Sequence, residues 1–115
     1  MLILALAIFT IVAIQGLLLA FDVFKTRDSS VLFARIHAGL ALLGSALVIA
    51  AAWQGDTRVY INIGLAVAII GLGFYIAFQR NKGRHPKALV ALHGSTAVAC
   101  YLILAYFALG LGQRL

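Results

Sequence analysis

The chain has 115 residues, of which 64% are hydrophobic and 10% are charged, and its net charge is +6. Soluble domains carry about a quarter charged residues, so this composition excludes an ordinary soluble globular domain. There is no glutamate and only one cysteine, which excludes paired-carboxylate catalysis, a disulfide framework and a four-cysteine metal site. Because the chain is so apolar, we assign its positive charge to contact with anionic lipid headgroups and not to nucleic acid.

Four long uncharged stretches divide the sequence, at residues 1–21, 36–55, 59–79 and 88–113. All twelve Lys, Arg and Asp residues lie outside them, and each stretch has about the 20 residues that a helix needs to cross a bilayer. Strands are excluded because the runs are far longer than a barrel strand. The sequence therefore predicts an all-α, integral membrane four-helix bundle. Residues 1–115 form one transmembrane domain, with spans at about 2–24, 31–53, 59–79 and 86–110.

The segments between the spans are short and predict how the helices begin and connect. After the first span, Asp28, Ser29 or Ser30 can accept hydrogen bonds from the free N–H groups that open the next helix. The link 54–58 is so short that the second and third spans must be adjacent and antiparallel. Pro86 fits the first turn of the fourth span, where its missing N–H is not needed. These links predict an up-down-up-down bundle.

Basic residues are unevenly distributed over the two ends of this bundle. Seven of the nine lie in or beside the first and third loops, namely Lys25, Arg27, Arg35, Arg80, Lys82, Arg84 and Lys87, whereas Arg58 and Arg114 lie at the other end. The positive-inside rule then predicts that the two basic loops are cytoplasmic and that both termini lie outside. Trp53 and Tyr60 would lie at the outer interface, where aromatic residues are enriched. We expect the bacterial cytoplasmic (inner) membrane as the location.

The two halves of the sequence resemble each other and suggest a duplicated helical hairpin. Gly16 placed on Gly71 gives an offset of 55, and His37 placed on His93 gives an offset of 56. Apolar sequence of low complexity also produces such matches by chance. Duplication and chance both stay open at this point.

His37 and His93 are the candidate functional residues. With helix starts at Val31 and Lys87, both are six residues into their helices, about 9 Å from the helix end. The second and fourth spans run in the same direction and are diagonal partners in an up-down-up-down bundle, so inward-facing side chains on them meet across the centre. This is the arrangement needed to hold one haem iron from both faces, as axial histidines do in membrane b-type cytochromes.

A haem plate also needs room and partners for its propionates. Glycines near the histidine depth are Gly16, Gly71 and Gly73, and small residues on the histidine faces are Ala41, Gly44, Ala97 and Cys100. Basic residues at the predicted cytoplasmic end that can pair with propionates are Arg35, Arg80, Arg84 and Lys87. We therefore expect a non-covalent haem b with His37 and His93 as iron ligands. The predicted cofactor-binding residues beside them are Gly16, Gly71, Gly73, Arg35 and Arg84.

Two functions from different classes fit these residues. One is a small cytochrome b-like protein for single-electron transfer. The other is a structural or assembly subunit of a membrane complex, because small residues also serve ordinary helix packing and intramembrane histidines also serve polar packing or proton handling. A haem near one face does not cross a hydrocarbon core of about 30 Å. A quinone, another redox protein or a second copy of the chain would have to complete the electron path.

Missing residues argue against two further classes of protein. The size and predicted topology resemble those of the small multidrug transporters, which depend on a membrane-embedded glutamate, whereas this chain has Gln15 in mid-span and no glutamate. A zinc site needs at least three protein ligands. His37 and His93 supply two, and Asp22 is the only conceivable third.

The remaining polar residues of the spans have simpler interpretations. We expect Asp22 to be paired near Lys25 at the interface. Cys100 is isolated from any C-x-x-C-H motif, which excludes covalent haem attachment and favours a packing role. His85, beside Pro86, is interpreted as a solvated residue or a helix cap.

Overall fold

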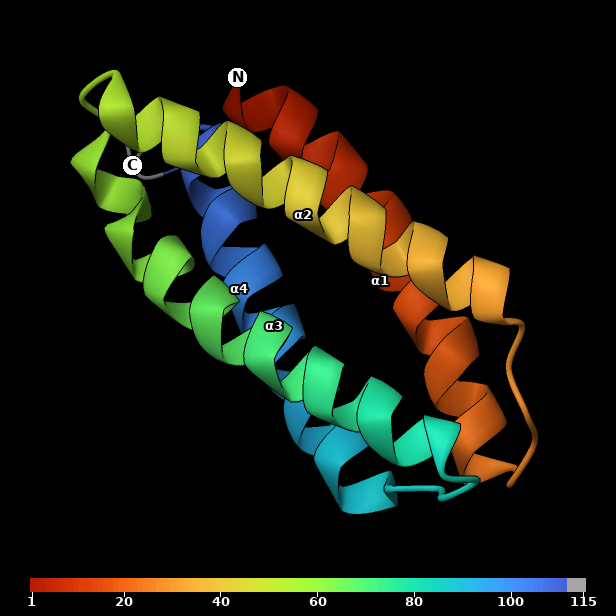
Figure 1. The fold of residues 1–115 in the computed structure, drawn as a ribbon. Coiled ribbons are helices and arrows are strands. Elements are labelled where there is room, and N and C mark those ends of the chain that lie inside the picture. The colour runs from red at the N-terminus through yellow and green to blue at the C-terminus, as the bar shows by residue number, and fades with distance from the viewer. Residues whose placement is uncertain (112–115) are drawn as a thin grey trace.

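The computed structural model describes residues 1–111 and contains four long antiparallel helices (Figure 1). They are α1 (Leu2–Phe24), α2 (Val31–Trp53), α3 (Tyr60–Asn81) and α4 (Lys87–Ala108), with the short 3₁₀ helix η1 (Thr57–Val59) before α3. Each long helix has the length and apolar composition needed to cross a membrane. The predicted all-α four-helix bundle is confirmed, and its apolar helices indicate an integral membrane protein in contact with lipid.

The ends of α1 and α2 coincide with the sequence prediction, whereas α3 begins later and extends further. η1 accounts for the later start. The Asp56 carboxylate accepts a hydrogen bond from the Arg58 backbone N–H at 3.3 Å and so caps the 3₁₀ turn. The Arg58 side chain also donates to Asp56, and these hydrogen bonds hold the pKa of Asp56 below its ordinary value.

Local chemistry also sets the ends of α2 and α4. Ser30 is the N-cap of α2, because its Oγ accepts a hydrogen bond from the Phe33 N–H at 3.2 Å. Pro86 is the N-cap residue of α4 and not part of its first turn, which is a correction of one position. α4 stops at Ala108, short of the predicted end, and Gly110 follows with a φ of +64°, the left-handed conformation that commonly ends helices.

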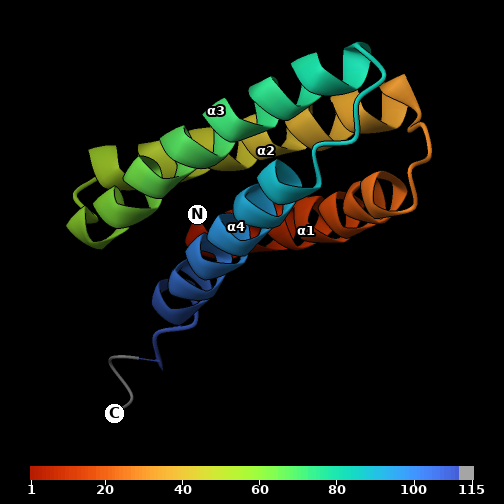
Figure 2. The ribbon, with the colours of Figure 1, turned by 90° about the horizontal axis from the view of Figure 1, so that it is seen from below.

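The four helices form a ring in which each contacts two neighbours. α1 packs against α2 and α4, and α3 packs against α4 and, least extensively, α2. Within residues 1–111, no contact joins α2 with α4 or α1 with α3, so these are diagonal pairs as the sequence predicts. Figure 2 shows α2 and α3 in one layer and α1 and α4 in the other, with α4 inclined to α1.

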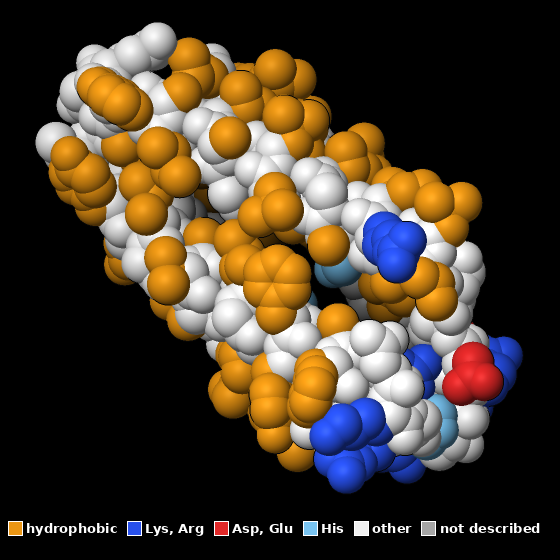
Figure 3. All heavy atoms as spheres, in the orientation of Figure 1, with side chains coloured by type: hydrophobic (Ala, Val, Ile, Leu, Met, Phe, Trp, Pro, Cys, Tyr) orange, Lys and Arg blue, Asp and Glu red, His pale blue; other side chains and the backbone are white. Residues whose placement is uncertain are grey.

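The hydrophobic core lies at the end of the bundle that holds the N-terminus and the α2–α3 turn. Its buried residues are Ala5, Val48, Ala52, Val59 and Leu104. Towards the opposite end α2 and α3 separate, and Figure 3 shows an opening between them with histidine side chains at its base. Lys and Arg side chains gather at that end (Figure 3). The bundle is therefore packed at one end and hollow at the basic end.

Trp53 and Tyr60 mark the packed end of the bundle, where both side chains are exposed. Arg58 lies at the same end, in η1. Arg114, the other basic residue expected there, lies outside the described residues. Among residues 1–111, seven basic residues thus lie at or near the end with the α1–α2 and α3–α4 loops and one, Arg58, lies at the packed end, as the sequence predicts.

A glycine in the packed half offers a test of this architecture. A Cβ at Gly44 would lie 2.9 Å from two carbons of the Phe9 ring, whereas a Cβ at Gly39 of the same helix would meet nothing within 4 Å. Overpacking costs about 1–3 kcal/mol, against about 1 kcal/mol gained in helix propensity. We predict that Gly44→Ala lowers the free energy of unfolding, measured by circular dichroism during SDS titration, and that Gly39→Ala does not. Equal stability of the two variants would contradict this packing.

Candidate functional site

The hollow half of the bundle surrounds a cavity of 1310 Å³. All four helices line it, and it exceeds the roughly 300–1,000 Å³ of most small-molecule pockets. Its wall is mostly apolar, with both predicted histidines among the lining residues. His37 and His93 therefore reach one common space from diagonal helices, and neither is exposed on the outer surface.

His93 is oriented by a hydrogen bond to the backbone of α3. Its Nδ1 lies 2.9 Å from the carbonyl oxygen of Ile69. Because a carbonyl can only accept, the ring proton is on Nδ1 and Nε2 keeps its lone pair. Metal-binding histidines are commonly oriented through their second ring nitrogen in this way. His93 is thus prepared to donate a lone pair from Nε2.

His37 has a corresponding setting against α1. The Val12 carbonyl faces its ring, but it does not meet hydrogen-bond geometry with Nδ1, which is buried without a partner. Within residues 1–111 the His37 ring therefore lacks a hydrogen bond of the quality that orients His93, although the Val12 carbonyl faces it.

A glycine on the neighbouring helix makes room for each ring. A Cβ at Gly16 would lie 3.1 Å from His37 Cε1, and a Cβ at Gly73 would lie 3.2 Å from His93 Cε1. Both distances are shorter than ordinary van der Waals contact, so even an alanine would displace the ring. The same edge of each imidazole therefore rests on bare helix backbone.

The carbonyl that faces each ring belongs to the residue four positions before that glycine. Val12 precedes Gly16 and Ile69 precedes Gly73 by this spacing. A helical side chain leans over the turn that precedes it, so a missing side chain leaves the carbonyl uncovered. The histidine, glycine and carbonyl thus form one unit that occurs in both halves of the chain.

The repeated unit corrects one sequence equivalence. Gly16 corresponds to Gly73, an offset of 57, and not to Gly71. A Cβ at Gly71 would meet nothing within 4 Å, and Gly71 does not line the cavity. Gly44 packs against Phe9 and not on the cavity, whereas the small residues Ala41, Ala97 and Cys100 do line it.

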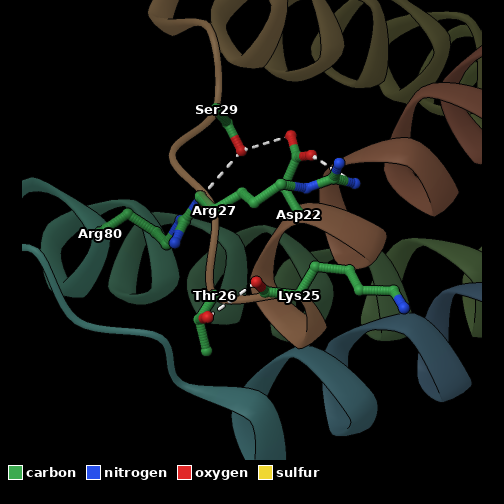
Figure 4. A network of polar contacts seen from close by, with 6 residues as sticks. All are labelled: Asp22, Lys25, Thr26, Arg27, Ser29 and Arg80. Atoms are coloured by element: carbon green, nitrogen blue, oxygen red, sulfur yellow. Dashed lines mark hydrogen bonds and ion pairs between the residues drawn. The ribbon is translucent and has the colours of Figure 1, made fainter.

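A polar network fastens the basic end of the bundle (Figure 4). Arg80 Nη2 donates to the Arg27 carbonyl oxygen at 2.6 Å and to Ser29 Oγ at 3.0 Å. Ser29 Oγ in turn donates to Asp22 Oδ2 at 2.9 Å. Asp22 is paired with Arg27, at 3.7 Å from Nη2, and not with Lys25 as the sequence suggested. The network joins the α1–α2 loop to the end of α3.

The predicted anion-binding residues separate into two groups. Arg35 and Arg80 line the cavity. Arg84 donates to Gln79 Oε1 at 2.8 Å and lies away from the cavity, as does Lys87. His85 accepts a hydrogen bond on Nδ1 from Arg80 Nη1 at 2.6 Å, so it takes part in the network and does not cap α4.

The donor set limits which metal chemistry these residues can support. Residues 1–111 contain no group of three or more His, Cys, Asp or Glu side chains that could hold a metal ion. A zinc centre with three protein ligands therefore finds no support. Haem iron needs only two axial ligands from the protein, which matches the two imidazoles.

Three polar residues that line the deeper part of the cavity were not predicted from the sequence as site residues. Ser45, Asn62 and Tyr101 line its wall towards the packed end. Ser45 follows His37 by eight residues, and Tyr101 follows His93 by the same number. This equal spacing could have identified Ser45 and Tyr101 from the sequence as residues on the same helix faces as the two histidines.

Comparison with protein-family models, curated proteins and solved structures finds no match to this chain. Function must therefore be inferred from the residues of the cavity themselves.

If the network in Figure 4 holds the α1–α2 loop in place, its loss should speed amide hydrogen exchange in that loop. Arg80→Met removes the donors that hold Arg27 and Ser29, so backbone amides of residues 25–30 should exchange with deuterium at least about threefold faster. Arg84→Met removes the same charge from the same end but only a bond to Gln79, and it should leave this exchange unchanged. Equal exchange in both variants would contradict the role of the network.

Proposed function

We propose that this protein binds one non-covalent haem b through His37 and His93 and transfers single electrons in a membrane. The observation that carries the proposal is the orientation of His93, whose Nδ1 donates to the Ile69 carbonyl and whose Nε2 remains free. His37 lines the same cavity from the diagonal helix. Bis-imidazole haem iron, when bound, takes up and releases one electron by alternating between its ferric and ferrous forms.

The surroundings of the imidazoles fit a flat apolar ligand with acidic side groups. The wall of the cavity around the two histidines is largely apolar. Arg35 lines the cavity and makes no ion pair within residues 1–111. Together with Arg80 it would neutralise carboxylates at the basic mouth.

We also propose an orientation and a location. The uneven distribution of Lys and Arg supports a cytoplasmic basic end, with both termini outside, in the bacterial cytoplasmic membrane. The histidines are then about 9 Å from the cytoplasmic end of their helices. A quinone, another redox protein or a second copy of the chain would have to exchange electrons with the site.

The alternative is a structural or assembly subunit. The hydrogen bond between His93 and Ile69 is compatible with it, because a packing histidine also needs a partner in an apolar bundle. Such a protein needs no cofactor, so absorption spectroscopy distinguishes the two functions.

The haem proposal predicts low-spin bis-imidazole spectra. The protein, purified in mild detergent with haem supplied, should show these bands in its oxidised and reduced forms, and both His37→Ala and His93→Ala should abolish them. His85→Ala should keep them, because His85 lies in the loop network and not on the cavity. A colourless protein would favour the structural alternative, and an unchanged spectrum in either variant would exclude that histidine as an axial ligand.

The glycines provide a second test of the same site. Gly16→Ala and Gly73→Ala place a methyl group against a histidine ring, so each should weaken haem affinity by about tenfold, about 1.4 kcal/mol. Gly71→Ala is the matched control, since its Cβ meets nothing. The measurement is a haem titration followed at the Soret band. An equal loss of haem affinity in Gly71→Ala and Gly73→Ala would show that the position of the His93 ring does not govern haem binding.

A further inference from the structure

The cavity continues beyond the histidines and is polar again towards the packed end. Ser45 of α2, Asn62 of α3 and Tyr101 of α4 line this part of its wall. Ser45 and Tyr101 lie eight residues beyond His37 and His93, which is about 12 Å along the helices. The part of the cavity beyond the histidines thus has its own set of polar groups.

Two of these groups already use their protons within the protein. Ser45 Oγ donates to the Ala41 carbonyl at 2.7 Å. The Asn62 amide nitrogen is directed at Cys100, with its carbonyl oxygen at 3.0 Å and its Sγ at 3.4 Å. Because the Cys100 carbonyl can only accept, the assignment of the Asn62 amide nitrogen is determined.

The direction of the Tyr101 hydrogen bond follows from its partner. Tyr101 Oη lies 2.7 Å from Thr10 Oγ1, and Thr10 Oγ1 lies 2.8 Å from the Leu6 carbonyl oxygen. The carbonyl accepts the one hydroxyl proton of Thr10, so Tyr101 must donate to Thr10. The Tyr101 proton is therefore also committed.

What remains at this end of the cavity is a set of acceptors without donors. Asn62 is 3% exposed, and its Oδ1 has no hydrogen-bond partner but is enclosed by protein atoms, so it adds no acceptor to the cavity surface. The Ser45 and Tyr101 oxygens keep lone pairs to which no group within residues 1–111 donates. Such a wall favours a ligand whose own polar groups are donors, because acceptors on a ligand would meet only acceptors.

We propose that this end of the cavity binds a quinol, an apolar aromatic ring with two O–H donors, in preference to the corresponding quinone, whose carbonyls only accept. The proposal rests on the haem function for its physiological meaning, but binding itself needs no haem. The opening between α2 and α3 (Figure 3) gives a lipid-soluble molecule lateral access. Asp28, at the basic mouth, is the one carboxylate that lines the cavity within residues 1–111, which disfavours a cation at this end.

The test compares the two redox forms of one probe. The full-length protein in lipid nanodiscs is dialysed anaerobically against a decyl-substituted benzoquinol or its quinone, and the uptake of empty nanodiscs is subtracted. We expect at least about tenfold tighter binding of the quinol. Ser45→Ala and Tyr101→Phe each remove one acceptor oxygen and should weaken quinol binding severalfold without changing quinone binding. Tyr75→Phe is the control, because Tyr75 does not line the cavity.

The haem spectrum of the same samples separates the two proposals. Quinol preference in a protein that binds no haem overturns only the haem function. Haem binding with equal affinity for quinol and quinone overturns the quinol site and leaves water as the partner of these oxygens. Identical quinol binding by Tyr101→Phe, Ser45→Ala and Tyr75→Phe also overturns it. A quinol preference that falls in Ser45→Ala and Tyr101→Phe supports the quinol site. Each variant is judged by its ratio of quinol to quinone affinity, so reduced stability of one variant does not change this conclusion.

Discussion

The contact between a histidine ring and the bare backbone of a neighbouring helix occurs twice in this bundle, and the cavity depends on it. His37 rests on Gly16 and His93 rests on Gly73. Since helix association in lipid depends on close packing, glycine lets each pair of helices approach while the ring extends towards the centre. Small residues such as Ala41 and Ala97 follow on the same wall. The centre of the basic half therefore remains open while the far end packs as a hydrophobic core.

Polar atoms in an apolar bundle must find partners, because leaving them unpaired is costly. Within residues 1–111 the buried side-chain atoms without a partner are Gln15 Oε1, His37 Nδ1 and Asn62 Oδ1. Two of these three belong to residues that line the cavity. All three atoms are themselves enclosed by protein, so these unpaired groups lie behind the cavity surface and not on it.

The fold was accessible from the sequence because its determinants are local. Uncharged runs long enough to cross a membrane predicted the four helices, and the short links between them predicted their antiparallel order. Ser30 belongs to a residue type that commonly caps helix N-termini, and it caps α2. From that order the diagonal placement of the two histidine-bearing helices followed.

The details of the site depend on helix rotation, which the sequence does not specify. Gly71 and Gly73 are two residues apart, so they lie on different faces of α3, and only one of them can meet His93. Arg84 was misassigned for a related reason. It lies in a loop, where its side chain bonds to Gln79, whereas Arg35 is carried to the cavity by α2.

The most direct test of the central claim is electron–nuclear double resonance on oxidised, haem-loaded protein in which histidine alone carries ¹⁵N. Two imidazoles facing one cavity from diagonal helices predict strong coupling of the iron to ring nitrogens of two histidines, reduced to one in a protein lacking either His37 or His93. Coupling to a single histidine in the unsubstituted protein, or to none, would contradict the account.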